Sequence, residues 1–137
     1  MRRTLLAAAA LVVAGLAGAP GAVAASLVGF QSPSKNIGCI LDDSFARCDI
    51  RKRDWSPPRK PSSCGEDYGQ GLSIARNGSR GRFVCAGDTA LGSGKVLAYG
   101  RSIRRGKITC TSRESGVTCK NARGHGFRIS RGSYRVF

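Results

Sequence analysis

Residues 37–48, with the sequence IGCILDDSFARC, decide the fold, and residues 108–119, ITCTSRESGVTC, repeat their pattern. In each stretch two cysteines enclose eight residues, with β-prone residues beside the cysteines and turn-forming residues in the middle. Facing residues of a non-hydrogen-bonded antiparallel pair lie about 4.5 Å apart, which is within disulfide reach. Each stretch therefore predicts a β-hairpin whose two strands are joined by a cystine. A similarity this short favours two ordinary hairpins over an internal duplication.

The chain contains six cysteines, an even number that predicts a disulfide framework in a small exported domain. They are Cys39, Cys48, Cys64, Cys85, Cys110 and Cys119. The hairpins predict the pairs 39–48 and 110–119, and the pair 64–85 follows by elimination. The sequence lacks close thiolate pairs such as C-x₂-C, which a zinc site needs. We therefore expect three disulfides, no metal and no cofactor.

The first 24 residues have the three-part pattern of an export signal. Arg2 and Arg3 begin it, residues 5–16 form an apolar run, and Ala22-Val23-Ala24 provides a small-x-small cleavage site. The run of about 12 residues is shorter than the ~20 that cross a bilayer. We expect secretion, with residues 1–24 removed and residues 25–137 left as one domain. Cleavage lowers the formal net charge from +15 to +13, because it removes two arginines and no acidic residue.

The rest of the chain predicts short strands and little helix. No segment keeps apolar residues at helical spacing for three turns. Residues 72–74, 82–85, 96–99 and 127–130 read as strands, and Asn77-Gly78 reads as a tight turn. The fold class is therefore all-β: a small antiparallel sandwich or barrel of short strands, stapled by three disulfides.

The charge balance is the main functional signal, with 23 Lys and Arg against 8 Asp and Glu. Arg51, Arg53 and Trp55 combine cations with an aromatic ring, as binders of single-stranded nucleic acid do. The candidates for binding a polyanion are Arg51, Arg53, Trp55, Arg101, Arg104, Arg105, Lys107, Arg128 and Arg131. The alternative is a generally cationic surface without a specific ligand, since net charge affects solubility and association but does not identify a partner. No motif for reading base sequence occurs.

A catalytic interpretation centres on His125, the only histidine. With Glu66 or Glu114 as base, and arginines holding a phosphate, it would follow the logic of small secreted ribonucleases. Asp88 is a further candidate partner of His125. A histidine between two glycines is more typical of a turn, and Asp88 of a turn-capping residue. We therefore favour a protein that is not an enzyme.

Several segments carry a family resemblance. They are FQSPSKNIGC at 30–39, FVCAGDT at 83–89, LAYG at 97–100, GVTCKN at 116–121 and GHGFRISR at 124–131, followed by Tyr134. In these segments the chain resembles a family of small exported actinobacterial proteins of unknown function. The resemblance implies export, paired cysteines and a single domain, and it implies no activity.

Together these observations predict a secreted, monomeric, basic binding domain. Its expected partner at the cell exterior is an anionic polymer (an envelope polymer, nucleic acid or acidic lipid) or an extracellular protein. Two alternatives are a phosphodiester hydrolase that uses His125 and an inhibitor or toxin-like effector.

Overall fold

The structure, a computed structural model, describes residues 9–18 and 26–137. Residues 9–18 have no regular secondary structure, and the side chains of Leu11, Val12, Val13 and Leu16 are exposed. They belong to the apolar run of the predicted export signal. The positive start of that signal and its cleavage site lie outside the described residues.

The described residues contain eleven strands. They are β1 (Val28–Gln31), β2 (Ile37–Leu41), β3 (Phe45–Ile50), β4 (Tyr68–Ala75), β5 (Arg82–Cys85), β6 (Lys95–Val96), β7 (Ser102–Arg105), β8 (Ile108–Arg113), β9 (Gly116–Lys120), β10 (Gly126–Ile129) and β11 (Tyr134–Val136). No helix occurs in the described residues, so the expected all-β class is confirmed.

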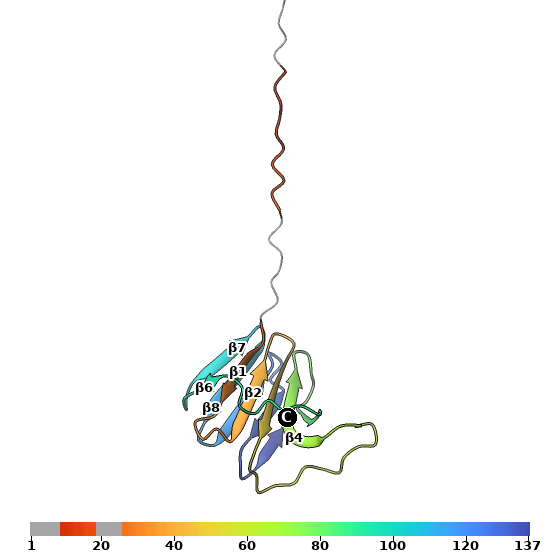
Figure 1. Cartoon of the computed structure of the whole chain (residues 1–137), viewed down its shortest axis with the longest axis vertical. Helices are drawn as coiled ribbons and strands as arrows, with labels where there is room; N and C mark the ends of the chain where they lie inside the picture. Colours follow the sequence, from red (N-terminus) through yellow and green to blue (C-terminus); the bar gives the residue numbers. More distant parts are fainter. Residues whose placement is uncertain (1–8, 19–25) are drawn as a thin grey trace, which may run out of the picture.

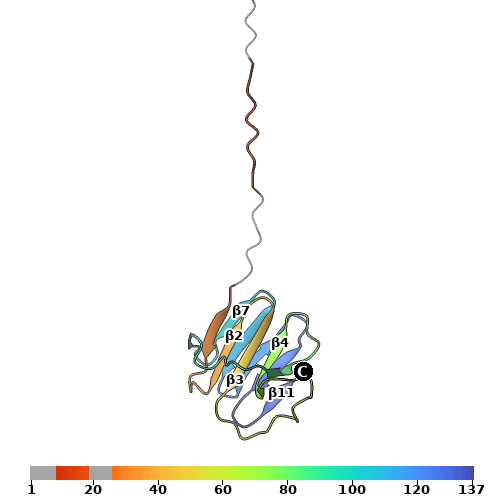
Figure 2. The ribbon, with the colours of Figure 1, turned by 45° about the vertical axis from the view of Figure 1, so that its right-hand side comes forward.

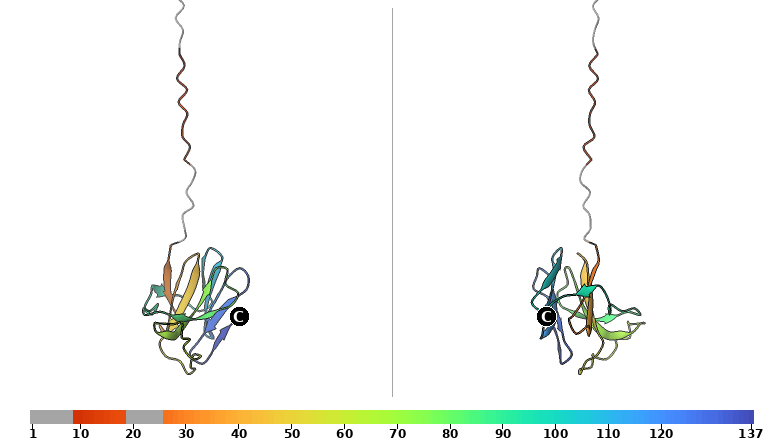
Figure 3. Two further views of the ribbon diagram at one scale, coloured as in Figure 1. Left: turned by 90° about the vertical axis from the view of Figure 1, so that its right-hand side faces the viewer. Right: turned by 60° about the vertical axis from the view of Figure 1, so that its left-hand side comes forward.

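The strands form two sheets that face each other as a sandwich (Figures 1 and 3). The first sheet has the order β5-β4-β3-β2-β1-β6 and the second has the order β11-β10-β9-β8-β7. Strands β1 to β5 form one antiparallel meander, and strands β7 to β11 form another. Only β6 departs from this plan, because it pairs in parallel with β1.

Both meanders place a cystine between their second and third strands. Cys39 lies opposite Cys48, and Cys110 lies opposite Cys119. The Cα atoms are 4.1 Å apart in each pair, so the predicted cystine hairpins are confirmed. The third disulfide joins Cys64 to Cys85, also as expected. The two stretches thus occupy equivalent places in two similar meanders.

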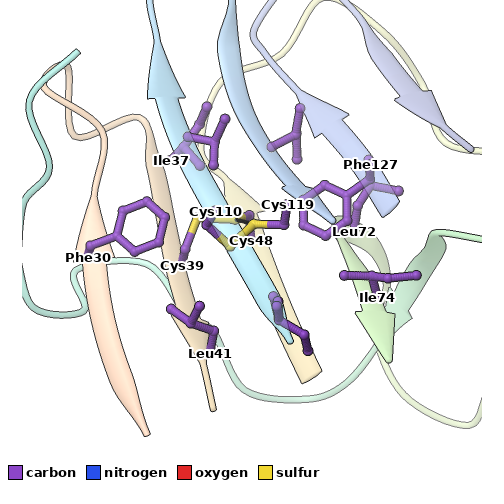
Figure 4. Packing of buried hydrophobic residues seen from close by; sticks show 14 of the residues in the cluster. Phe30, Ile37, Cys39, Leu41, Cys48, Leu72, Ile74, Cys110, Cys119 and Phe127 are labelled. Atoms are coloured by element: carbon purple, nitrogen blue, oxygen red, sulfur yellow. Dashed lines mark hydrogen bonds between the residues drawn. A yellow bond between two sulfur atoms is a disulfide. The ribbon is translucent and has the colours of Figure 1, made fainter. Parts of the chain in front are cut away.

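The core lies between the sheets, and the two hairpin cystines are at its centre (Figure 4). Phe30 and Leu72 flank the first cystine in register, and Phe127 lies beside the second. All of these side chains are buried. All the strands of the described residues and all three disulfides fall within residues 26–137, and so does the core cluster that the structure describes.

The outer face of the first sheet is covered by the chain itself. Residues 86–94, called the strap below, connect β5 at one edge of this sheet to β6 at the other (Figures 1 and 2). Gly38 and Gly71 allow the chain to pack closely at this face. A Cβ at Gly38 would lie 2.4 Å from the carbonyl oxygen of Ala90, and one at Gly71 would lie 2.3 Å from Asp49 Oδ1.

Two local expectations were confirmed only in part. The pairing of β4 with β5 ends at Ser73 and Arg82, so Asn77-Gly78 is not a two-residue hairpin turn. The Gly78 N–H closes a tight turn onto the carbonyl oxygen of Ala75 at 2.9 Å, but this turn lies within a longer loop. Of the expected strand at 96–99 only Val96 is in a strand, β6, because the chain then turns from the first sheet to the second. The backbone N–H of Gly100, just beyond, donates to Ser112.

Candidate cationic face and the predicted site residues

The outer face of the second sheet is polar and positively charged. Side chains along a strand point alternately to its two faces. Cys110, Cys119 and Phe127 point into the core, so the residues directly before and after each of them point away from it. One row across the sheet is Arg135, Arg128, Thr118, Thr111 and Ser102, and a second is Lys120, Thr109 and Arg104. These eight residues are called the cationic face below.

The charge on the segment that forms the second sheet is almost entirely positive. Residues 101–137 contain ten Lys and Arg and a single acidic residue, Glu114. Glu114 lies in the turn between β8 and β9 rather than in a strand. The short hydroxyl side chains of the cationic face are therefore flanked by cations, and neither row contains a carboxylate.

Several side chains of the cationic face are held in place. Arg128 donates to the carbonyl oxygen of Ser115 at 3.0 Å and to Ser133 Oγ at 3.2 Å. The guanidinium of Arg135 lies 5.2 Å from the centre of the Phe137 ring. The hydroxyls of Ser102 and Thr111 are 2.7 Å apart. Such contacts reduce the side-chain entropy that a ligand would otherwise have to remove.

The equivalent face of the first sheet has a structural use instead. Asp49 is fully buried there and accepts hydrogen bonds from Arg47 Nε at 2.9 Å and Nη2 at 2.7 Å. It also accepts one from the backbone N–H of Ala90 at 2.9 Å. Arg47 in turn donates to Asp88 Oδ1 at 2.8 Å. The buried pair thus fixes the strap to β3.

The same contacts shift two pKa values. Burial acts to lower the pKa of Arg47, but its hydrogen bonds and ion pairs with Asp49 and Asp88 outweigh burial and raise it. The hydrogen bond and the charge of Arg47 lower the pKa of Asp88 below its ordinary value of 3.8. Asp88 is therefore a partner of Arg47, rather than a turn cap or a partner of His125.

His125 lies in the turn between β9 and β10, where it bonds through its backbone. Its N–H donates to Asn121 Oδ1 at 3.2 Å, and its carbonyl oxygen accepts from the Asn121 N–H at 2.9 Å. The Asn121 amide also donates to the carbonyl oxygens of Ala75 and Gly78, at 3.1 and 2.8 Å. This turn therefore connects the two sheets through Asn121.

The structure does not bring the candidate bases to His125. Glu114 and His125 lie in the turns at opposite ends of β9, which puts them on the order of 15 Å apart. Glu66 precedes β4, whereas the His125 turn contacts the chain at and beyond the other end of that strand. Asp88 lies on the outer face of the first sheet.

Trp55 is packed into the fold. Its Nε1 donates to the carbonyl oxygen of Ser130 at 2.8 Å, and its ring centre lies 4.8 Å from Tyr134 and 6.3 Å from Phe83. Arg53 lies 4.9 Å from the indole centre and donates to the carbonyl oxygen of Gly69. The indole is only half-buried, but these contacts already use its N–H and part of its surface.

The remaining basic candidates are spread over different regions. Arg104 and Arg128 belong to the cationic face. Arg51 and Arg131 line one hollow at the end of the sandwich where β1 turns into β2. Arg105 donates to the carbonyl oxygen of Arg104, Lys107 follows in the turn after β7, and exposed Arg101 precedes that strand.

Two cations of the face, Lys120 and Arg135, were not among the sequence candidates. A signal for Lys120 was available, because it directly follows Cys119. Once the cystine is placed in the core, strand alternation puts the next side chain on the outer face. Arg135 needed the pairing of β10 with β11, which the sequence does not show.

Comparison with known proteins identifies the family. Residues 9–137 match the model of a family of unknown function, DUF6636, and the chain belongs to this family. No significant match was found among curated proteins or solved structures. Among the described residues, no helix is long and apolar enough to cross a membrane. In the same part of the chain, no three His, Cys, Asp or Glu side chains are grouped as metal ligands.

Proposed function

We propose that this chain is an exported, non-catalytic domain that binds an anionic polymer at the cell exterior through its cationic face. The observation that carries this proposal is the contrast between the two sheets. The outer face of the first sheet is covered by the strap, whereas the rows of the second sheet carry Arg104, Lys120, Arg128 and Arg135 with no carboxylate among them.

Physical chemistry favours a polymer over a single small anion. The cations of the face lie in two rows across a sheet, where neighbouring strands are about 4.8 Å apart. A polymer with regularly spaced charges meets several of them at once, and it releases condensed counterions when it does so. The hydroxyls between the cations offer hydrogen bonds without fixing a particular sequence of monomers.

Export is part of the proposal. Residues 9–18 are apolar and exposed, which suits a segment that is removed rather than packed. Three disulfides suit an oxidising compartment. We expect mass spectrometry of the protein from culture medium to find a chain that begins at Ala25. Recovery of the full-length chain from the cytoplasm alone would contradict export.

The binding test uses oxidised protein of residues 26–137 and an end-labelled single-stranded RNA as a model phosphate polymer. Anisotropy is recorded between about 50 and 200 mM salt, where phosphate contacts weaken steeply. The variant Lys120→Gln/Arg135→Gln removes two cations from the face. The control Arg59→Gln/Lys60→Gln removes two cations from the exposed loop between β3 and β4, so both variants have the same net charge.

We expect the face variant to bind more weakly, with a salt dependence smaller by about 1.4 in the slope of log K against log salt. The control variant should resemble the wild type. An equal loss in both variants would mean that only net charge matters, and it would overturn the assignment of the face. Absence of binding at the lowest salt would overturn the proposal as a whole. Shortened RNA, lost with His125→Ala, would support the hydrolase alternative instead.

A further inference from the structure

A second basic feature lies at the end of the sandwich where β1 turns into β2. It is a hollow of about 430 Å³ lined by Ser34, Lys35, Asn36, Arg51, Lys52 and Arg131. Four of these six residues are cations, and none is acidic. They come from three separate parts of the chain: the β1–β2 turn, the segment after β3, and the β10–β11 turn. The fold, rather than sequence proximity, brings them together.

The walls of this hollow are fixed by hydrogen bonds that use backbone atoms. The Asn36 amide donates to the carbonyl oxygen of Lys52 at 2.9 Å and accepts from the Lys52 N–H at 2.8 Å. The Arg51 N–H donates to the carbonyl oxygen of Asn36, and the Asp54 N–H donates to that of Arg131, at 2.9 and 2.8 Å. The three segments are thereby held together, while the Arg51 and Lys52 side chains take no part in these bonds.

Two features of this arrangement are energetically unfavourable: the repulsion between its cations and the backbone conformation of Lys35. Four cations around one hollow repel one another. Two carboxylates lie nearby: the exposed Asp54, 3.6 Å from Arg131, and Glu114, which lines a smaller adjoining hollow that shares Arg131. Lys35 has φ = 58°, in the left-handed region that disfavours residues with a side chain. Strained backbone of this kind is common where a ligand is bound. An anion in the hollow would relieve the repulsion.

We propose that this hollow binds a phosphoryl group. The anionic polymer would then carry phosphate rather than carboxylate groups. This inference rests on the proposed function. A phosphoryl group presents several oxygens in a tetrahedral arrangement, which cations from three directions satisfy. Two guanidinium groups add planar donor pairs that match phosphate geometry. A planar carboxylate has only two oxygens, so it would leave some of the four cations of the hollow without a partner.

The hollow is also connected to the cationic face. A smaller hollow beside it shares Ser34, Asn36 and Arg131 and continues to Arg113 and Glu114, where β8 of the second sheet ends. Arg128 of the cationic face donates to Ser133, in the same β10–β11 turn as Arg131. A polymer chain that lies across the face therefore reaches the hollow around this edge of the sandwich.

The test is an NMR titration of residues 26–137 with inorganic phosphate at constant ionic strength, with acetate as the matched anion. The variant Arg51→Gln/Lys52→Gln removes two cations from the hollow and keeps the backbone bonds that shape it. The control is again Arg59→Gln/Lys60→Gln. A well-dispersed amide spectrum of each variant shows that it is folded.

We expect phosphate to produce saturable shifts at Lys35, Asn36, Lys52 and Arg131, and acetate to produce none. The hollow variant should bind phosphate at least about tenfold more weakly, because charge-assisted hydrogen bonds are lost, and the control should not change. Diffuse, non-saturating shifts with both anions would overturn the inference, as would equal weakening in both variants. Because free phosphate needs no polymer, this result is independent of RNA binding at the cationic face, and either proposal can fail alone.

Discussion

The Sγ atoms of Cys48 and Cys119 lie 3.7 Å apart, although each belongs to a different disulfide. Their contact joins the cystines of the two meanders across the sandwich (Figure 4). All four cysteines of these two disulfides are fully buried. These disulfides therefore act as core side chains as well as cross-links, and they supply apolar volume beside the buried leucines and isoleucines.

The first prediction compares a core disulfide with the outer one. Removing either costs roughly 3 kcal/mol in loop-closure entropy, and slightly more for the 64–85 pair, which closes the longer loop. Cys39→Ala/Cys48→Ala also leaves a cavity beside the second cystine, whereas Cys85 is exposed. We expect the core variant to be less stable than Cys64→Ala/Cys85→Ala in urea unfolding. The reverse order would show that the sulfur contact adds nothing to packing.

The second prediction concerns the ion pair under the strap. Arg47→Leu leaves Asp49 buried without its main partner, and we expect a loss of about 3–5 kcal/mol in the free energy of unfolding. In Arg47→Leu/Asp49→Leu no charge is left buried, so this variant should be more stable than the single one. Urea unfolding of both measures the difference. If the double variant were the less stable one, the bonds from Asp49 to the strap would outweigh the cost of its buried charge.

The third prediction is a pH dependence. Arg47 lowers the pKa of Asp88 in the folded state, so the folded protein holds this carboxyl ionised more strongly than the unfolded chain does. The contribution to stability is therefore fully present above the ordinary value of 3.8 and is lost as the pH falls through the lowered folded value. In a carboxyl NMR titration we expect Asp88 to titrate below 3.8 in the wild type, and at a higher pH in Arg47→Leu. Equal midpoints would show that the ion pair does not form in solution.

The fourth prediction separates Asn121 from His125. Asn121→Ala removes all four hydrogen bonds of the side-chain amide, and we expect a loss of about 2–3 kcal/mol. His125→Ala keeps the backbone bonds of the turn and should change stability by no more than about 0.5 kcal/mol. Thermal unfolding of the two variants gives the comparison. A large loss in His125→Ala would reveal a structural role for the imidazole.

The parts of the fold that were predicted from sequence are local. The cystine hairpins followed from the eight residues between their cysteines, because a short disulfide loop with a polar centre leaves few other shapes. The third disulfide followed by elimination. The strap was not predicted, because its course depends on a contact between Ala90 and Asp49, 41 residues apart. Likewise, Asp88 could be singled out from sequence, but its partner Arg47 could not.

The candidate binding residues were predicted only in part, because the sequence does not show which distant residues share a surface. Sequence clusters such as Arg51-Lys52-Arg53 locate charge along the chain but not on a surface. The fold separates Arg51 from Arg53, placing the first in a hollow and the second against an indole ring. It also brings Arg51 and Arg131 to the same hollow, although they are far apart in the sequence. Strand register, rather than composition, decides which cations share a surface.

The order of the disulfides has a consequence for how the protein is made. The cysteines pair consecutively along the chain, the first with the second, the third with the fourth and the fifth with the sixth: 39 with 48, 64 with 85, and 110 with 119. In a chain that emerges into an oxidising compartment from its N-terminus, every disulfide can close between the two cysteines that emerged last. An oxidase that joins cysteines in order of appearance then produces the native set, without an isomerase to correct it.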